Sequence, residues 1–245
     1  MKYLKDIGSY FLMIKRVFGS YTKRSVLREL IFKELDDLII DSMPIVAFIS
    51  FFVGGVVAIQ TALNMDNPLI PESLIGYASR QSVILEFSPT FISIIMAGKV
   101  GSFITSSIGS MRVTEQIDAL EVMGINSLNY LVFPKIVALM FYPFVIAISM
   151  FLGIMGGWVA GVYGGFTSSS AFVEGLQESF IPYHLTYAFI KTVVFAFILA
   201  TVPSWQGYYM KGGALEVGKA STNSFVWTSV LIILSNYILT QLLLS

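Results

Sequence analysis

Charged residues are rare over most of the chain and are concentrated in a few short segments. The apolar stretches between them contain about 20 residues or more, which as helices are long enough to cross about 30 Å of hydrocarbon. The pattern predicts five membrane spans, at residues 43–64, 77–99, 136–165, 184–205 and 223–244. We therefore expect an all-α polytopic membrane protein in which residues 1–245 form one transmembrane domain.

Residues 1–42 show a different pattern, in which apolar residues recur every three or four positions and basic residues occupy the other faces. This spacing predicts two amphipathic helices that lie at the membrane interface before the first span, with a break at residues 19–21. The apolar positions are Leu4, Ile7, Phe11, Ile14 and Phe18 in the first helix and Leu27, Leu30, Ile31, Leu35 and Leu38 in the second.

The longest polar interruption between the spans contains a short amphipathic pattern at residues 112–124. Its apolar positions are Val113, Ile117, Leu120 and Met123, and its acidic flank is Glu115, Asp118 and Glu121. We expect a helix of about three turns that stops at Gly124, where a left-handed residue ends many helices. Such a helix lies on the bilayer, docks into another protein or is a solvated connector, and periodicity alone leaves these possibilities open.

Composition agrees with a membrane protein. Hydrophobic residues make up 56% of the chain and charged residues 12%, and the mean hydropathy is +0.77, more apolar than a soluble domain of this length can bury. The chain contains no cysteine, which excludes disulfides and thiolate metal sites. The N-terminus lacks the uninterrupted apolar core of a cleavable signal peptide, so we expect it to be retained.

The positions of the basic residues predict the orientation. Eight of the fifteen Lys and Arg residues precede residue 43, whereas the loops at 64–73 and 166–182 contain none. Because basic loops stay on the cytoplasmic side, we expect a cytoplasmic N-terminus and a periplasmic C-terminus. The loop at 166–182 has room for a short surface helix before Pro182.

Four glycines recur at every fourth position in the third span, Gly153, Gly157, Gly161 and Gly165. Such a stripe of small residues predicts close packing against another helix, either in the same chain or in a second copy. An odd number of spans argues against an inverted repeat within the chain, so twofold symmetry would require a second copy.

Two charged residues inside the spans are the main functional candidates. Glu86 and Lys191 are expected at similar depth, and a charge in hydrocarbon costs roughly 2.5–3.5 kcal/mol or more. They therefore line a polar spot in an apolar cavity or pair only to hold helices together. Arg80 is expected to contact headgroups at the outer boundary, and Gln60 is a further polar candidate.

Motifs for enzymatic chemistry are missing from the sequence. It has no P-loop, no HExxH pair and no GxSxG elbow, and it has one histidine, His184, which we interpret as an interfacial anchor. We expect no catalytic site, no metal site and no nucleic-acid partner. A chain without a nucleotide site cannot drive transport from ATP by itself.

The segment from Ala97 to Lys135 resembles the central motif of the MlaE/YrbE family. These proteins are permease subunits of ABC transporters that work with MCE-domain proteins to move lipids between membranes. The matching parts are AGKVG at 97–101, TEQIDALEVMG at 114–124 and NYLVFPK at 129–135. The chain departs from the family pattern at Lys99, where arginine is more usual, and at Phe87 and Ser88.

The resemblance implies specific partners and sites. The central helix would be a coupling helix that inserts into a separate cytoplasmic ATPase, which binds the ATP-Mg, so this chain needs no cofactor of its own. Family members act as homodimers in the bacterial inner membrane, with a phospholipid pocket between the two copies and an MCE-domain protein on the periplasmic side. The implied coupling residues are Arg112, Glu115, Gln116, Ile117, Asp118, Leu120 and Glu121, and the implied pocket residues are Gln60, Arg80, Glu86 and Lys191.

Two other classes remain open from the residues alone. One is an ion-coupled secondary transporter or channel without an ATPase, in which the intramembrane charges carry the coupling ion. The other is a membrane scaffold whose central helix only recruits a soluble partner.

Overall fold

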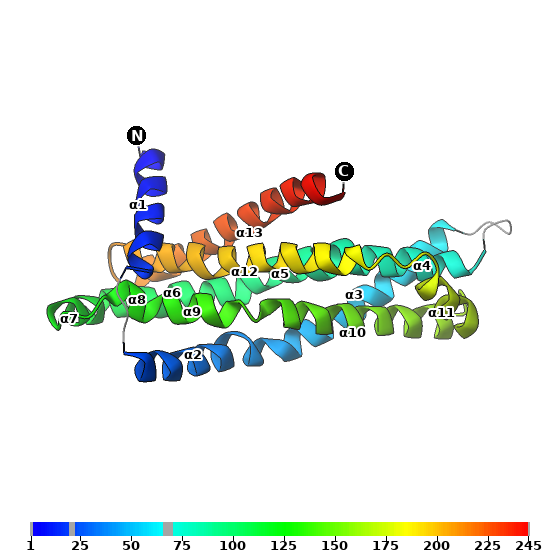
Figure 1. Cartoon of the computed structure of the whole chain (residues 1–245), viewed down its shortest axis with the longest axis horizontal. Coiled ribbons are helices and arrows are strands. Elements are labelled where there is room, and N and C mark those ends of the chain that lie inside the picture. The colour runs from blue at the N-terminus through cyan, green and yellow to red at the C-terminus, as the bar shows by residue number, and fades with distance from the viewer. Residues whose placement is uncertain (1, 20–22, 66–70, 245) are drawn as a thin grey trace. The chain divides into compact units, whose positions relative to one another are not determined.

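The computed structural model describes residues 2–19, 23–65 and 71–244, and every regular element in these ranges is helical (Figure 1). Three elements depart from the α-helix: η1 is a 3₁₀ helix, and η2 and η3 are π-helices. The elements are α1 (Lys2–Val17), α2 (Arg24–Leu38), η1 (Ile40–Ser42), α3 (Met43–Asn64), α4 (Ser73–Ser82), η2 (Val83–Phe91), α5 (Ile92–Met96), η3 (Ala97–Gly101), α6 (Ser102–Val113), α7 (Gln116–Val122), α8 (Ser127–Leu131), α9 (Phe133–Leu139), α10 (Tyr142–Tyr163), α11 (Ser169–Gln177), α12 (Tyr183–Tyr209) and α13 (Ala214–Leu244).

Five helical stretches among the described residues are long and apolar enough to cross a membrane, as predicted. They are Arg24–Asn64, Ser73–Val113, Ser127–Tyr163, Tyr183–Tyr209 and Ala214–Leu244. The all-α polytopic fold is thus confirmed. Two predicted features fall partly outside the description, since residues 66–70 of the loop at 64–73 and residues 20–21 of the break at 19–21 lie outside the described residues.

The third stretch differs from the single helix expected at 136–165. It is divided into α9 and α10 by a turn at Met140 and Phe141. Pro143 explains the division, because it has no amide to donate to the Leu139 carbonyl and its ring would clash there. The remaining spans begin and end near the expected positions, although α13 starts earlier, directly after the glycine pair at 212–213.

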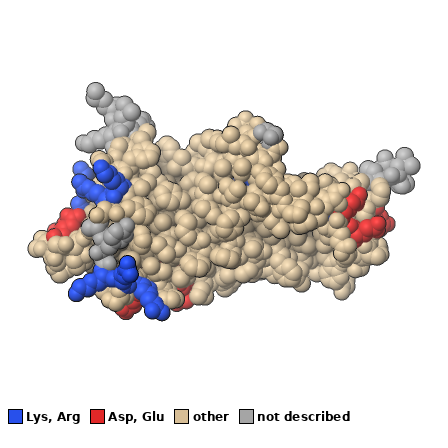
Figure 2. All heavy atoms as spheres, in the orientation of Figure 1, with Lys and Arg blue, Asp and Glu red and all other residues tan. Residues whose placement is uncertain are grey.

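The chain divides into two compact units. The first contains Met1–Ser42, Ile94–Tyr142 and Val194–Tyr237, and the second contains Met43–Ser93, Pro143–Val193 and Ile238–Ser245. All Lys and Arg residues other than Arg80 and Lys191 fall in the sequence ranges of the first unit. Figure 2 shows groups of these basic side chains on the surface of that unit.

In the first unit, the two N-terminal helices are anchored by polar contacts. Asn129 Nδ2 donates to the Val17 carbonyl at 2.8 Å and Asn126 Nδ2 donates to the Arg16 carbonyl at 3.0 Å, so both cap the end of α1. Away from these contacts, α1 exposes Ile7, Phe11 and Leu12, in agreement with the expected amphipathic helix.

The second N-terminal helix, α2, packs along α9 (Figure 1). A buried ion pair between Lys135 on α9 and Glu34 on α2 joins these two helices. Lys135 therefore helps to hold α2 against α9.

In the second unit, α3 and α10 meet along glycines. A Cβ on Gly54 would overlap the backbone of Gly153, and a Cβ on Gly156 would overlap the Phe51 carbonyl. The predicted close packing is confirmed, and the neighbour is α3 of the same chain. Gly165 has φ +75° and lies in the turn after α10 instead of in the seam.

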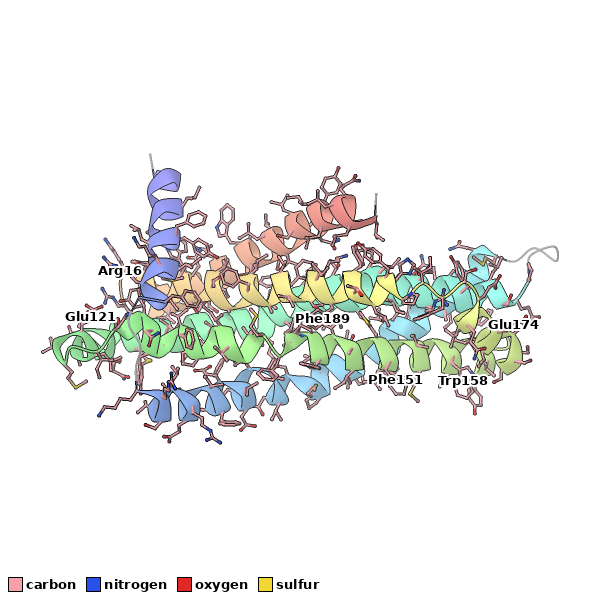
Figure 3. The ribbon with its side chains drawn as sticks, in the orientation of Figure 1. Arg16, Glu121, Phe151, Trp158, Glu174 and Phe189 are labelled. Carbon is pink, nitrogen blue, oxygen red and sulfur yellow. The ribbon has the colours of Figure 1, made fainter. Side chains whose placement is uncertain are left out.

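A second close approach joins α4 and α11, where Gly76 faces the Phe172 carbonyl and Gly175 faces the Ser73 carbonyl. The helix α11 is the short one expected in the loop at 166–182. On α10, Trp158 packs beside the core of the second unit and donates to the Ser169 hydroxyl at 3.2 Å, whereas Phe151 projects away from the neighbouring helices (Figure 3) and is 64% exposed. This apolar outer surface suits contact with lipid.

Candidate functional site

Lys191, on α12, is the most buried cation of the second unit, with 0% of its side chain exposed. Its ammonium group donates to Glu86 Oε1 at 3.0 Å, to the Tyr187 hydroxyl at 2.8 Å and to the Leu85 carbonyl at 3.0 Å. An ammonium group has three donors, and three acceptors surround it here. The two intramembrane charges are therefore brought together, as one of the sequence hypotheses expected.

Glu86 is much less enclosed than its partner, with 42% of its side chain exposed. Thr90 donates to Glu86 Oε2 at 3.1 Å, and Tyr187 and Thr240 approach Oε1 at 3.4 and 3.5 Å. The cluster therefore presents one accessible carboxylate held from three helical elements, η2, α12 and α13.

Three members of this cluster were missed by the sequence reasoning. Tyr187 lies one turn before Lys191 on α12, and Thr90 lies one turn after Glu86, so the i+4 spacing could have indicated both. Thr240 could not have been found this way, because only tertiary packing brings α13 to the pair; its hydroxyl lies 2.8 Å from that of Tyr187.

The element that carries Glu86 is the π-helix η2. Its irregularity follows from Pro89, which has no amide to offer the Leu85 carbonyl in an α-helical turn. Lys191 donates to that same carbonyl. π-helical segments within α-helices are frequently found at functional sites.

A small pocket lies between α3, η2 and α10, beside this element. Its walls include the hydroxyls of Ser50, Ser88 and Ser149 together with Val83 and Phe87. The space that it encloses has room for about one water molecule. This pocket is therefore too small to enclose a lipid.

Arg80 does not contact headgroups as expected. It is 3% exposed, and its Nη1 donates to the carbonyls of Leu176 at 2.6 Å and Glu178 at 3.0 Å. These carbonyls lie at the C-terminal end of α11, where a cation is favoured. Arg80 thus fastens α4 to α11, and its assignment to a lipid pocket stays a prediction.

Gln60 is exposed on α3. Among the described residues, the hydrogen bonds that join Glu86, Tyr187, Lys191 and Thr240 involve no atom of Gln60. Its assignment to a lipid pocket stays a prediction.

The helix expected at 112–124 is shorter than predicted. Arg112 and Val113 end α6, Glu115 has φ +60°, and α7 spans only Gln116–Val122. The left-handed backbone at Glu115 interrupts the helical hydrogen bonds between α6 and α7. The chain therefore continues into α7 in a new direction. Gly124 has φ +72°, so the expected stop is confirmed.

The residues of this segment divide into internal and external ones. Ile117 is 0% exposed, so we revise its expected role of filling a partner's groove: it anchors α7 within the first unit. Leu120 is partly buried, and Glu115 and Gln116 are exposed. The most exposed apolar residues are Val122 at 89% and Met123 at 65%, and Val122 was missed because it lies off the predicted stripe.

Three charged residues of the segment are engaged within the chain. Arg112 pairs with Asp118 at 2.8 Å, and Glu121 accepts hydrogen bonds from Tyr208 at 2.9 Å and Ser127 at 3.0 Å. Figure 3 labels Glu121 near α7 and α8. The acidic flank is therefore not wholly available to a partner.

The fold and the buried ion pair define a multi-pass helical membrane protein with a polar site within its spans. The family model described as Permease MlaE matches residues 31–242. The chain therefore belongs to the MlaE family of ABC-transporter permeases, as the sequence resemblance indicated.

Individual relatives agree with this assignment. A probable ABC transporter permease protein of Rickettsia conorii is 33% identical over 243 residues, which cover 99% of this chain and 93% of the relative. The intermembrane phospholipid transport system permease protein MlaE of Haemophilus influenzae is 26% identical, with 98% and 95% covered. The chloroplastic protein TRIGALACTOSYLDIACYLGLYCEROL 1 of Arabidopsis thaliana is 28% identical, with 82% and 57% covered.

Family membership has direct consequences. The chain is a non-enzymatic transport subunit and a multi-pass protein of the inner membrane. Membership also implies, in general, an ATPase partner and an MCE protein.

Proposed function

We propose that this chain is the permease through which a phospholipid or related lipid moves between the inner and outer membranes. The observation that carries the proposal is the Glu86–Lys191 cluster, in which a fully buried ammonium holds a carboxylate that is 42% exposed. Such a pair offers ionic groups to a headgroup, while the surrounding apolar spans suit acyl chains. The printed name of the Haemophilus influenzae relative, a phospholipid transport permease, supports the substrate class.

The energy for this movement comes from a separate cytoplasmic ATPase that binds ATP-Mg and docks at α7. The exposed Val122 and Met123, next to the partly buried Leu120 and the exposed Glu115 and Gln116, provide an apolar centre with a polar rim, which is the usual composition of an interface. The buried Ile117 supports this surface from inside.

The lipid pocket forms between two copies of the chain. The pocket described above is too small for a lipid. In addition, only 11% of the most apolar 18-residue stretch of α13 is buried. A second copy packed there would cover this surface and add walls to the site. An MCE-domain protein receives or supplies the lipid on the periplasmic side.

The proposed orientation has the N-terminus in the cytoplasm and the C-terminus in the periplasm. It is supported by the basic residues, which fall almost entirely in the sequence ranges of the first unit. Basic segments stay on the cytoplasmic side, and the proposed ATPase-docking helix α7 belongs to this unit.

The test uses the permease reconstituted with its ATPase in liposomes that contain a fluorescent phospholipid. Glu86→Gln keeps an acceptor for Lys191 but removes the negative charge, so we expect ATP-dependent lipid transfer to fall by roughly tenfold or more, which corresponds to about 1.4 kcal/mol. The matched control is Glu174→Gln, which neutralises an exposed carboxylate on α11 of the same unit.

Three outcomes would contradict the proposal. Unchanged transfer by Glu86→Gln, with only a lower unfolding temperature, would make the ion pair a structural support. Transfer that needs an ion gradient and no ATP would indicate a secondary transporter. A complex that binds the ATPase but moves no lipid would indicate a scaffold.

A further inference from the structure

Tyr208, near the C-terminal end of α12, is contacted by Glu121 of α7 and by Arg112 of α6. Its hydroxyl donates to Glu121 Oε1 at 2.9 Å, and the Arg112 guanidinium lies over its ring at 5.9 Å. Arg112 in turn pairs with Asp118 on α7 at 2.8 Å. Glu121 of α7 contacts Tyr208 directly, and Asp118 of α7 is linked to it through Arg112.

A third group completes this contact. The Ser127 hydroxyl lies 2.9 Å from the Tyr208 hydroxyl and donates to Glu121 Oε1 at 3.0 Å. Ser127 is 2% exposed and Tyr208 8% exposed. Hydrogen bonds to a carboxylate are stronger than those between neutral groups, so the partly enclosed cluster holds the α7–α8 corner firmly against α12.

The helix that carries Tyr208 is long. A single α-helix, α12, runs from Tyr183 to Tyr209 with Pro203 inside it, and it carries both Tyr208 and Lys191. Rigid elements and hydrogen-bond networks with discrete arrangements are the structures through which energetic coupling travels. A displacement of α7 that keeps these hydrogen bonds pulls on the C-terminal end of α12, the helix that also carries Lys191.

We propose that Tyr208 is a positioning residue that transmits movement of α7 to α12 through Glu121, Ser127 and Arg112. This inference rests on the proposed function, in which an ATPase docks on α7. It assigns Glu121, which is exposed but hydrogen-bonded to Tyr208 and Ser127, the role of passing the movement inward from a docked partner.

The test is a comparison of two adjacent tyrosines in the permease assembled with its ATPase in liposomes. Tyr208→Phe keeps the ring and removes the hydroxyl, whereas Tyr209→Phe makes the same change on a side chain that is 38% exposed. For Tyr208→Phe we expect normal copurification of the ATPase and several-fold fewer lipids transferred per ATP hydrolysed. For Tyr209→Phe we expect both quantities to be unchanged.

A second set of variants distinguishes transmission from simple folding. Glu121→Gln keeps an oxygen that accepts from Tyr208 and Ser127, so it should retain more lipid transfer per ATP than Glu121→Ala. The double variant Glu121→Ala with Tyr208→Phe should be no worse than the more affected single variant, because both changes remove the same hydrogen bond.

The outcomes separate this inference from the function on which it rests. Full lipid transfer per ATP in Tyr208→Phe would overturn the transmission role and leave the proposed function intact. Loss of the ATPase or of the folded permease in Tyr208→Phe would also overturn it, since the hydroxyl would then maintain the docking surface or the fold. If the unaltered chain binds no ATPase, the proposed function itself fails.

Discussion

Arg80 and Lys191 are both cations in helices that cross the membrane, and both are almost completely removed from solvent. They differ in what surrounds them. Arg80 donates to two backbone carbonyls at the end of α11, whereas Lys191 pairs with a carboxylate that is still 42% exposed. Only the second arrangement leaves a charged group accessible to a ligand, so the burial of a cation alone does not identify a binding site.

We expect Arg80→Ala to destabilise the fold without a specific effect on transport. The change leaves the carbonyls of Leu176 and Glu178 without their guanidinium donor, and an unsatisfied buried polar group costs about 1–3 kcal/mol. Thermal unfolding in detergent should therefore shift to lower temperature, whereas lipid transfer per folded molecule should not change. Lys211→Ala, at an exposed position, is the control.

A normal unfolding temperature with lost lipid transfer would contradict this structural role for Arg80. It would return the residue to the headgroup contact that its position in the sequence suggested.

For single helices, the sequence predicted most of the features that follow from the spacing of apolar and small residues. The glycine stripe correctly indicated close packing, and the apolar stretches correctly indicated five spans. It did not reveal that Gly156 belongs to the seam, or that Pro89 turns part of the second span into a π-helix. The first depends on which neighbour the helix meets, and the second on the missing amide of Pro89; the period of the apolar residues contains neither.

The same limit applies to the segment between the second and third spans. Its periodicity placed Ile117 beside Leu120 on one apolar stripe, but the structure buries the first and exposes Val122 instead. A stripe shows which residues share a helix face. It does not show whether that face meets the chain itself or another protein.

Gly156→Ala should therefore destabilise the second unit, because the added Cβ would overlap the Phe51 carbonyl oxygen on α3. Gly8→Ala on α1 is the matched control, since a Cβ there meets nothing within 4 Å. Its expected effect is neutral or slightly stabilising, by roughly 0.5–1 kcal/mol, from helix propensity. Circular dichroism during heating in detergent measures both variants.

Equal unfolding temperatures for the two variants would mean that α3 and α10 can move apart to admit the Cβ without a loss of stability. The seam would then not be a close-packed contact.

For the whole molecule, the remaining question is what covers α13. Its residues Ser224, Thr228 and Ile232 are buried, whereas Val226, Val230 and Ile233 are exposed. At 100° per residue these two sets lie on opposite faces of the helix. The sequence predicted that α13 spans the membrane but not which side faces inward, because its apolar residues surround the whole helix.

We expect the exposed face of α13 to meet the same face of a second copy. Because the chain has no cysteine, a single introduced cysteine gives an unambiguous crosslink. In a twofold interface, residues near the axis approach their own copies, so Val226→Cys, Val230→Cys and Ile233→Cys should yield disulfide-linked dimers in native membranes. Phe144→Cys on α10, which replaces a side chain that is 63% exposed, should remain monomeric.

The periodicity of the crosslinks makes the result decisive. Efficient crosslinking at 226, 230 and 233 but not at the buried Thr228 would indicate a specific helix face, whereas uniform crosslinking along α13 would indicate random collision in the membrane. Dimers linked through Phe144→Cys and none through α13 would place the second copy against α10. The lipid pocket could then not be completed at α13, where Thr240 approaches Glu86.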